Sequence, residues 1–154
     1  MELPADAFGR FVDEVRLFCN AVRPRLGLFA GIRITGGGLL RRPVLTRDEV
    51  NINGWPPMRA GYEPFNLTRV YSEKYGSAYR DRKPDDVGLY WDYVQTNGNA
   101  YDVVVTAALI SLCHHVPECV IESDGGMDDW AAGIDLYQRV TGRQVPADYL
   151  GAQA

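Results

Sequence analysis

The chain has 154 residues, of which 46% are apolar and 23% are charged, and its formal net charge is −4. These proportions are typical of a single globular domain over residues 1–154, and they exclude disordered and collagen-like classes. The acidic balance argues against general nucleic-acid binding.

Two features of the sequence argue against a membrane protein or an exported one. The longest apolar run, residues 103–113, is interrupted by Thr106 and Ser111 and is shorter than the ~20 residues that span a bilayer. Near the start of the chain, Asp6, Asp13 and Glu14 interrupt any apolar core that a signal peptide would need. We therefore expect a cytoplasmic protein with no membrane partner.

The first element is a helix predicted over residues 5–22. Pro4 suits its first turn, Asp6 complements its N-terminus, and Pro24 ends it. The residues of its apolar face recur every three or four positions and are Phe8, Phe11, Val12, Val15, Phe18, Cys19 and Val22.

Strands follow the first helix. Alternating apolar residues predict a strand over 28–34, which the glycines 36–38 end, and shorter strands near Val44, over 50–52 and over 65–71. The intervening loop 53–58 carries Trp55. Because loops on a rigid scaffold often carry function, Trp55 is a candidate contact residue, with a role in capping the core as the alternative.

The second half of the chain predicts a strand over 89–96, a helix over 99–115, a strand over 119–123 and a helix over 128–140. This order of elements predicts an α+β domain. We expect a mostly antiparallel sheet of about five short strands, with three helices packed mainly on one face.

Cysteines and histidines offer no predicted metal or cofactor site. Cys19, Cys113 and Cys119 form no CxxC pair, so free thiols are expected, with a disulfide between Cys113 and Cys119 as the alternative. His114 and His115 are adjacent on a helix, where neighbouring side chains diverge by about 100°. Neither a shared metal between the histidines nor a Cys113–His115 nucleophile pair is favoured.

Charge is divided unequally along the chain. Residues 1–83 carry 14 basic and 9 acidic side chains, whereas residues 84–154 carry 2 basic and 11 acidic ones. The two halves either neutralise each other in the fold or leave an acidic face that attracts a basic partner.

The acidic half contains the most suggestive stretch, in which Glu122, Asp124, Asp128 and Asp129 surround a Gly-Gly turn. Three interpretations remain open: capping of the last helix, a protein-binding face, and a site for Mg²⁺ or Ca²⁺. Aromatic residues concentrate earlier, at Tyr71, Tyr75, Tyr79, Tyr90, Trp91 and Tyr93, and are typical both of cores and of binding surfaces. The candidate contact residues are Trp55, Tyr90, Trp91, Asp124, Asp128 and Asp129.

Two hypotheses on function follow. The first is a non-catalytic protein-binding domain, such as a bacterial immunity or antitoxin protein that neutralises a basic protein partner and needs no cofactor. The second is a small metal-assisted hydrolase in which Glu122, Asp124 and Asp128 hold the metal and His115 acts as acid or base. No feature of the sequence indicates whether the protein is a monomer or an oligomer.

Overall fold

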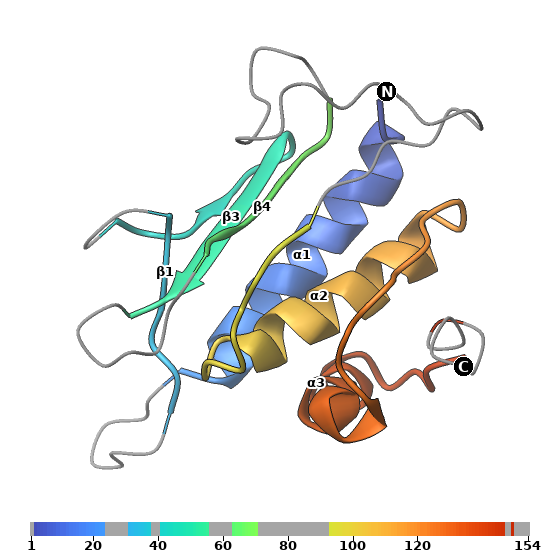
Figure 1. The fold of residues 1–154 in the computed structure, drawn as a ribbon. Coiled ribbons are helices and arrows are strands. Elements are labelled where there is room, and N and C mark those ends of the chain that lie inside the picture. Colours follow the sequence, from blue (N-terminus) through green and yellow to red (C-terminus); the bar gives the residue numbers. More distant parts are fainter. Residues whose placement is uncertain are drawn as a thin grey trace.

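Helices and strands occupy separate parts of the molecule (Figure 1). The computed structural model describes residues 2–23, 31–37, 41–55, 63–70, 93–146 and 149. Its helices are α1 (Ala5–Ala21), α2 (Asp102–His115) and α3 (Met127–Thr141). Its strands are β1 (Ile34–Thr35), β2 (Val44–Leu45), β3 (Glu49–Gly54) and β4 (Phe65–Thr68). The predicted α+β class is confirmed.

Strand β3 is the centre of the sheet, and each of the other described strands pairs with it in the antiparallel sense. Strands β2 and β4 both pair with Val50 and Asn51, so they must lie on opposite edges of β3. Strand β1 pairs with Asn53 and Gly54 at the far end of β3. The mostly antiparallel sheet is therefore confirmed, with four strands in the described residues where about five were expected.

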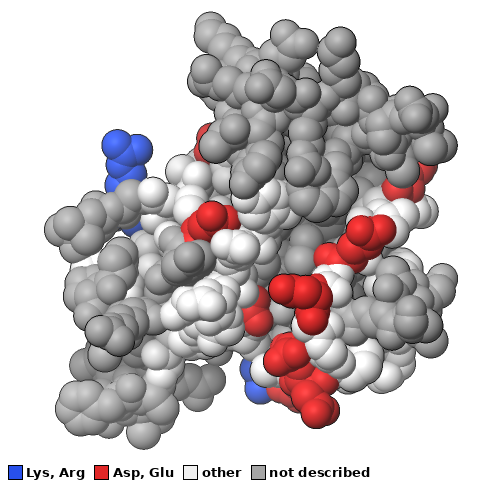
Figure 2. Space-filling model, viewed as in Figure 1, with Lys and Arg blue, Asp and Glu red and all other residues white. Residues whose placement is uncertain are grey.

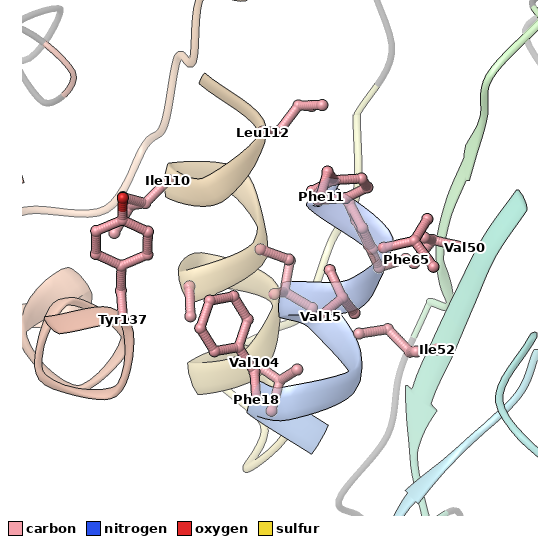
Figure 3. Packing of buried hydrophobic residues seen from close by; sticks show 14 of the residues in the cluster. Phe11, Val15, Phe18, Val50, Ile52, Phe65, Val104, Ile110, Leu112 and Tyr137 are labelled. Carbon is pink, nitrogen blue, oxygen red and sulfur yellow. The ribbon is translucent and has the colours of Figure 1, made fainter. Parts of the chain in front are cut away.

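The layers follow one another from the sheet to α3. Figure 3 shows Val50 and Ile52 of β3 facing the side chains of α1, while α2 lies between α1 and Tyr137 of α3. The helices thus stack on one face of the sheet, as predicted. The fully buried side chains that join these layers are Phe8, Phe11, Val15, Phe18, Val50, Ile52, Val104, Ile110, Leu136 and Tyr137.

Helix α2 is central because it is apolar around nearly its whole circumference. Nine of its residues are buried, including successive ones such as Val104, Val105, Thr106 and Ala107. A helix with this composition must be covered on several sides, and α1 and α3 supply the cover. No helix within the described ranges combines the length and apolar character needed to cross a membrane.

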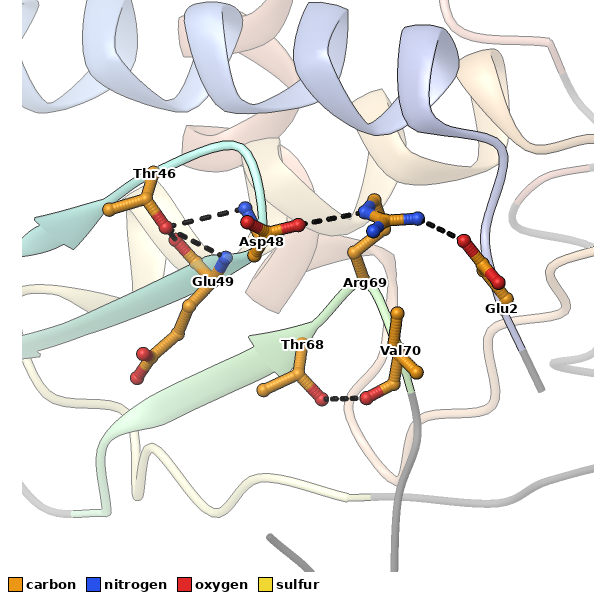
Figure 4. A network of polar contacts seen from close by, with 7 residues as sticks. All are labelled: Glu2, Thr46, Asp48, Glu49, Thr68, Arg69 and Val70. Atoms are coloured by element: carbon orange, nitrogen blue, oxygen red, sulfur yellow. Dashed lines mark hydrogen bonds and ion pairs between the residues drawn. The ribbon is translucent and has the colours of Figure 1, made fainter.

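A polar network ties the N-terminus to the sheet (Figure 4). The Arg69 guanidinium contacts the Glu2 carboxylate and lies 2.9 Å, from Nε to Oδ1, from Asp48. The backbone N–H of Leu3 also donates to the Arg69 carbonyl oxygen at 2.8 Å. Because Asp48 belongs to the turn between β2 and β3, one side chain links three segments of the chain.

Three predicted strands differ from the structure. The strand expected over 28–34 is described only from residue 31, and β1 begins at Ile34. Residues 93–96 of the strand expected over 89–96 form no strand, and residues 89–92 lie outside the described ranges. Residues 119–123 also form no strand, and no described segment pairs with them where the chain connects α2 to α3.

Candidate functional site

The connection between α2 and α3 begins with a tight reversal. Helix α2 ends at His115, and the N–H of Val116 still donates to the Leu112 carbonyl oxygen at 2.8 Å. The N–H of Cys119 then donates to the Val116 carbonyl oxygen at 2.9 Å. Pro117 stands at the second position of this turn, where its fixed φ is favourable.

The start of α3 is fixed by hydrogen bonds from the two glycines. The N–H of Gly125 donates to Ser123 Oγ at 3.0 Å, and the N–H of Gly126 donates to Asp129 Oδ2 at 2.8 Å. Gly126 is the N-cap, so Asp129 supplies one half of a capping box. The capping role considered for this turn is thus confirmed for Asp129, and Asp128 shares the first turn.

Carboxylates line this connection on its exposed side. We call residues 118–129 the acidic segment, and its acidic side chains, all exposed, are Glu118, Glu122, Asp124, Asp128 and Asp129. Figure 2 shows acidic side chains gathered on one face, over the chain between α2 and α3. The two basic residues that follow pair elsewhere, Arg139 with Asp135 and Arg143 with Glu14. Within the described ranges, no ion pair involves a carboxylate of the acidic segment.

Two apolar side chains stand exposed within the acidic segment. Val120 is 74% exposed and Met127 is 54% exposed, and they are the two most exposed large apolar residues in the described ranges. Single exposed apolar residues are ordinary on protein surfaces. Two in one twelve-residue acidic segment give it a mixed apolar and anionic character that suits contact with another protein.

Of the aromatic candidates, Trp55 does not join the acidic segment in the structure. Trp55 follows β3 at the sheet, partly exposed, with the Arg33 guanidinium carbon 4.7 Å from its ring centroid. The acidic segment instead leads into α3, which lies on the other side of α1 and α2 from the sheet (Figure 1). Tyr90 and Trp91 lie outside the described residues.

The residues proposed for a metal-assisted hydrolase are not gathered into a metal site. The described part of the chain contains no group of three or more His, Cys, Asp or Glu side chains arranged to hold a metal ion. His115 is not placed to act as acid or base beside these carboxylates. Its Nε2 lies 2.9 Å from Glu14 Oε1, and its side chain is only 7% exposed. The hydrolase hypothesis thus gains no support from the geometry.

A second polar site, which sequence reasoning missed, lies where the three helices meet. The Glu14 carboxylate of α1 accepts a hydrogen bond from Ser111 Oγ at 2.7 Å and contacts His115, both on α2. Arg143, just beyond α3, donates to the same carboxylate. The Glu14 side chain is 16% exposed, so these three groups replace most of its hydration.

The sequence contains one signal for this cluster. Glu14 follows Phe11 by three residues and precedes Phe18 by four, which places an acidic side chain on the apolar face of α1. A charge on a buried face requires partners. The sequence alone does not identify them, because they are separated from Glu14 by 97 residues or more.

The partners of Glu14 determine its ionisation. Burial raises the pKa of the carboxyl, but the hydrogen bonds from Arg143, Ser111 and His115 together outweigh burial, so the pKa lies below its ordinary value of 4.5. Arg143 also lies over the Tyr137 ring, with its guanidinium carbon 5.3 Å from the ring centroid. The Glu14 cluster therefore joins α1 to α2 and to the residue just beyond α3 through polar contacts inside the fold, whereas the acidic segment faces solvent.

Low pH should weaken the polar contacts that Glu14 makes with Ser111, His115 and Arg143. Because the folded-state pKa of Glu14 is lowered, its stabilisation is complete above pH 4.5 and is lost as the pH falls through the folded-state value. We expect urea unfolding of the wild type to show a steeper loss of stability below pH 4.5 than unfolding of Glu14→Gln. Equal slopes for the two proteins would contradict this assignment. Burial, followed by the Arg143 and His115 charges, lowers the pKa of His114 in both proteins, and this loss of stability occurs at higher pH.

The acidic segment is the better candidate for contact with another molecule, because its polar groups are exposed whereas those of the Glu14 cluster have partners inside the fold. The exposed carboxylates, together with exposed Val120 and Met127, give this segment its mixed anionic and apolar character. Comparisons with protein-family models, with curated proteins and with solved structures found no match.

Proposed function

We propose that this protein is a non-catalytic binding domain whose acidic segment docks on a basic protein surface. The observation that carries the proposal is the set of exposed carboxylates in residues 118–129, which form no ion pair within the described ranges and stand beside exposed Val120 and Met127. Charge complementarity specifies a partner rich in Lys and Arg.

The expected contact has an apolar centre and an anionic rim. Methionine is common in the centre of protein interfaces, while charged residues concentrate at their edges. Met127 and Val120 would supply the centre, and Glu122, Asp124 and Asp128 the rim. Such a rim mainly accelerates association and selects the partner.

A bacterial immunity or antitoxin protein is the class of binding protein that we propose. Proteins of this class act by covering a partner, so they need a rigid surface and no catalytic group. The Asp129 cap on α3 and the turn from Val116 to Cys119 fix the backbone at both ends of the acidic segment. The partner is then a basic toxin of the same cytoplasm.

Removal of three rim charges should weaken this interaction. The test compares the triple variant Glu122→Gln, Asp124→Asn, Asp128→Asn with wild type, each immobilised and exposed to lysate of the source cells, with captured proteins quantified by mass spectrometry. We expect basic proteins captured by the wild type to be depleted about tenfold, at roughly 0.5 kcal/mol per exposed ion pair. Higher salt should release the same proteins.

A matched control removes three exposed charges elsewhere through Asp6→Asn, Asp13→Asn and Asp135→Asn. These side chains pair with arginines on their own helices. The control therefore has the same net charge as the triple variant but keeps the acidic segment intact. A second arm replaces Val120 and Met127 with serine and should lower capture without changing its salt dependence. Equal loss in the charge variant and the control, or captured proteins that are acidic, would refute the proposal.

A further inference from the structure

Two of the three cysteines lie close together where α2 ends. Cys113 is in the last turn of α2, and its Sγ lies 3.4 Å from the carbonyl oxygen of Cys119. A residue's Cα lies about 2.4 Å from its own carbonyl oxygen, which places the Cys113 sulfur within roughly 6 Å of the Cys119 Cα. The turn at Pro117 creates this proximity, because it reverses the chain between the two residues.

The two thiols differ in their access to solvent. Cys113 is buried, whereas Cys119 is partly exposed at the start of the acidic segment. Cys19, the third cysteine, is buried in α1, on the face of that helix that packs into the core. A reagent from solution therefore reaches Cys119 first.

We propose that Cys113 and Cys119 form a reversible intrachain disulfide when the protein meets a small-molecule disulfide such as oxidised glutathione. The Cys119 thiolate attacks one glutathione sulfur, the glutathione S–S bond breaks, and the first glutathione leaves and takes up a proton. The Cys113 thiolate then attacks the Cys119 sulfur, and the second glutathione leaves as a thiol. Two protein thiols are oxidised, and one glutathione disulfide is reduced to two thiols.

The exchange is slow at neutral pH. Burial, followed by the nearby Cys119 thiol, raises the pKa of Cys113 to about 12, and burial followed by Glu118 raises the pKa of Cys119. Only the thiolate is nucleophilic, so both steps accelerate as the pH rises. The pair thus responds to sustained oxidation rather than to brief exposure.

A disulfide here acts on the acidic segment. Cys119 lies between Glu118 and Val120, so a covalent bond to α2 would restrict the backbone that presents these two side chains. The effect on partner binding rests on the proposed function. Formation of the disulfide does not, since it depends only on the two thiols and the oxidant.

The test uses the full chain equilibrated in glutathione buffers of graded oxidised-to-reduced ratio, at pH 8.5, followed by acid quenching. Free thiols are then alkylated in denaturant and counted by mass spectrometry. We expect the count to fall from three to one, with the missing alkyl groups at Cys113 and Cys119. The folded protein should reach half-oxidation at a ratio about tenfold lower than the same chain in urea, because the fold raises the effective concentration of one thiol near the other.

Two variants complete the experiment. Cys19→Ala should form the same disulfide, while Cys119→Ser should keep both remaining thiols free at every ratio. The proposal is overturned if all three wild-type thiols remain alkylatable, if Cys119 stops at a stable mixed disulfide with glutathione, or if folded and urea-treated chains oxidise at the same ratio. The thiol count tests the disulfide, whereas capture of basic proteins from lysate tests the proposed function. Failure of the capture experiment would therefore leave the disulfide proposal unaffected.

Discussion

Replacing Glu14 with alanine is expected to lower the free energy of unfolding by about 3 kcal/mol, the cost of breaking a largely buried ion pair by removal of one partner. The carboxylate accepts hydrogen bonds from Ser111 and Arg143 and contacts His115. Its loss leaves the fully buried Ser111 hydroxyl without an acceptor and the Arg143 charge without its counter-ion. Urea unfolding at pH 7 measures the change.

Two variants distinguish the loss of the Glu14 contacts from a general effect of substitution in α1. Asp13→Ala removes the neighbouring acid, which is exposed and pairs with the exposed Arg16, so its cost should stay below about 0.5 kcal/mol. Glu14→Gln keeps an acceptor for Ser111 and should cost less than Glu14→Ala. A loss for Glu14→Ala no greater than that for Asp13→Ala would show that the cluster contributes little.

Replacing Gly133 with valine is expected to cost about 3 kcal/mol, because even one added carbon has no room there. Gly133 is a buried residue of α3 at its contact with α2. A Cβ at this position would lie 2.4 Å from the Cβ and Cγ2 atoms of Thr106, so the two helices would have to separate. Thermal unfolding followed by circular dichroism measures the loss.

The matched control is Ala132→Val, one residue earlier on the exposed side of α3. It introduces the same β-branched side chain into the helix without a steric conflict, so only the difference in helix propensity, a few tenths of a kcal/mol, is expected. By propensity alone Gly133→Val would be slightly stabilising, because glycine is a poorer helix former than valine. A loss for Gly133→Val no larger than that for Ala132→Val would therefore show that the close approach of α2 and α3 does not control the effect. Gly133→Ala should fall between them.

The helices were the most predictable part of the fold. Helix α1 was expected over 5–22 and spans Ala5–Ala21, and α3 was expected over 128–140 and spans Met127–Thr141. A helix repeats its apolar face every 3.6 residues, and its ends depend on nearby capping groups, so both signals are local. Capping by Asp129 was one of three interpretations open for its turn, and the hydrogen bond from Gly126 selects it.

The strands were less predictable, because a strand exists only where another strand pairs with it. Residues 119–123 have the apolar, β-branched character of a strand but no pairing partner among the described residues, and they form a connection that carries Val120 to the surface. In contrast, Phe65–Thr68 meets β3 and becomes β4. Composition alone does not distinguish these two cases.

The sequence by itself determined the α+β class, the three helices and the excess of acid in residues 84–154, since each depends on composition or on residues a few positions apart. Only the tertiary structure decided which charges have partners. It joined Glu14 to Arg143 across 129 positions and left the acidic segment without ion pairs among the described residues. It also placed Trp55 at the sheet, away from that segment. The physical reason is that helix packing, which depends on the whole core, controls the distances between charges that lie far apart in the chain.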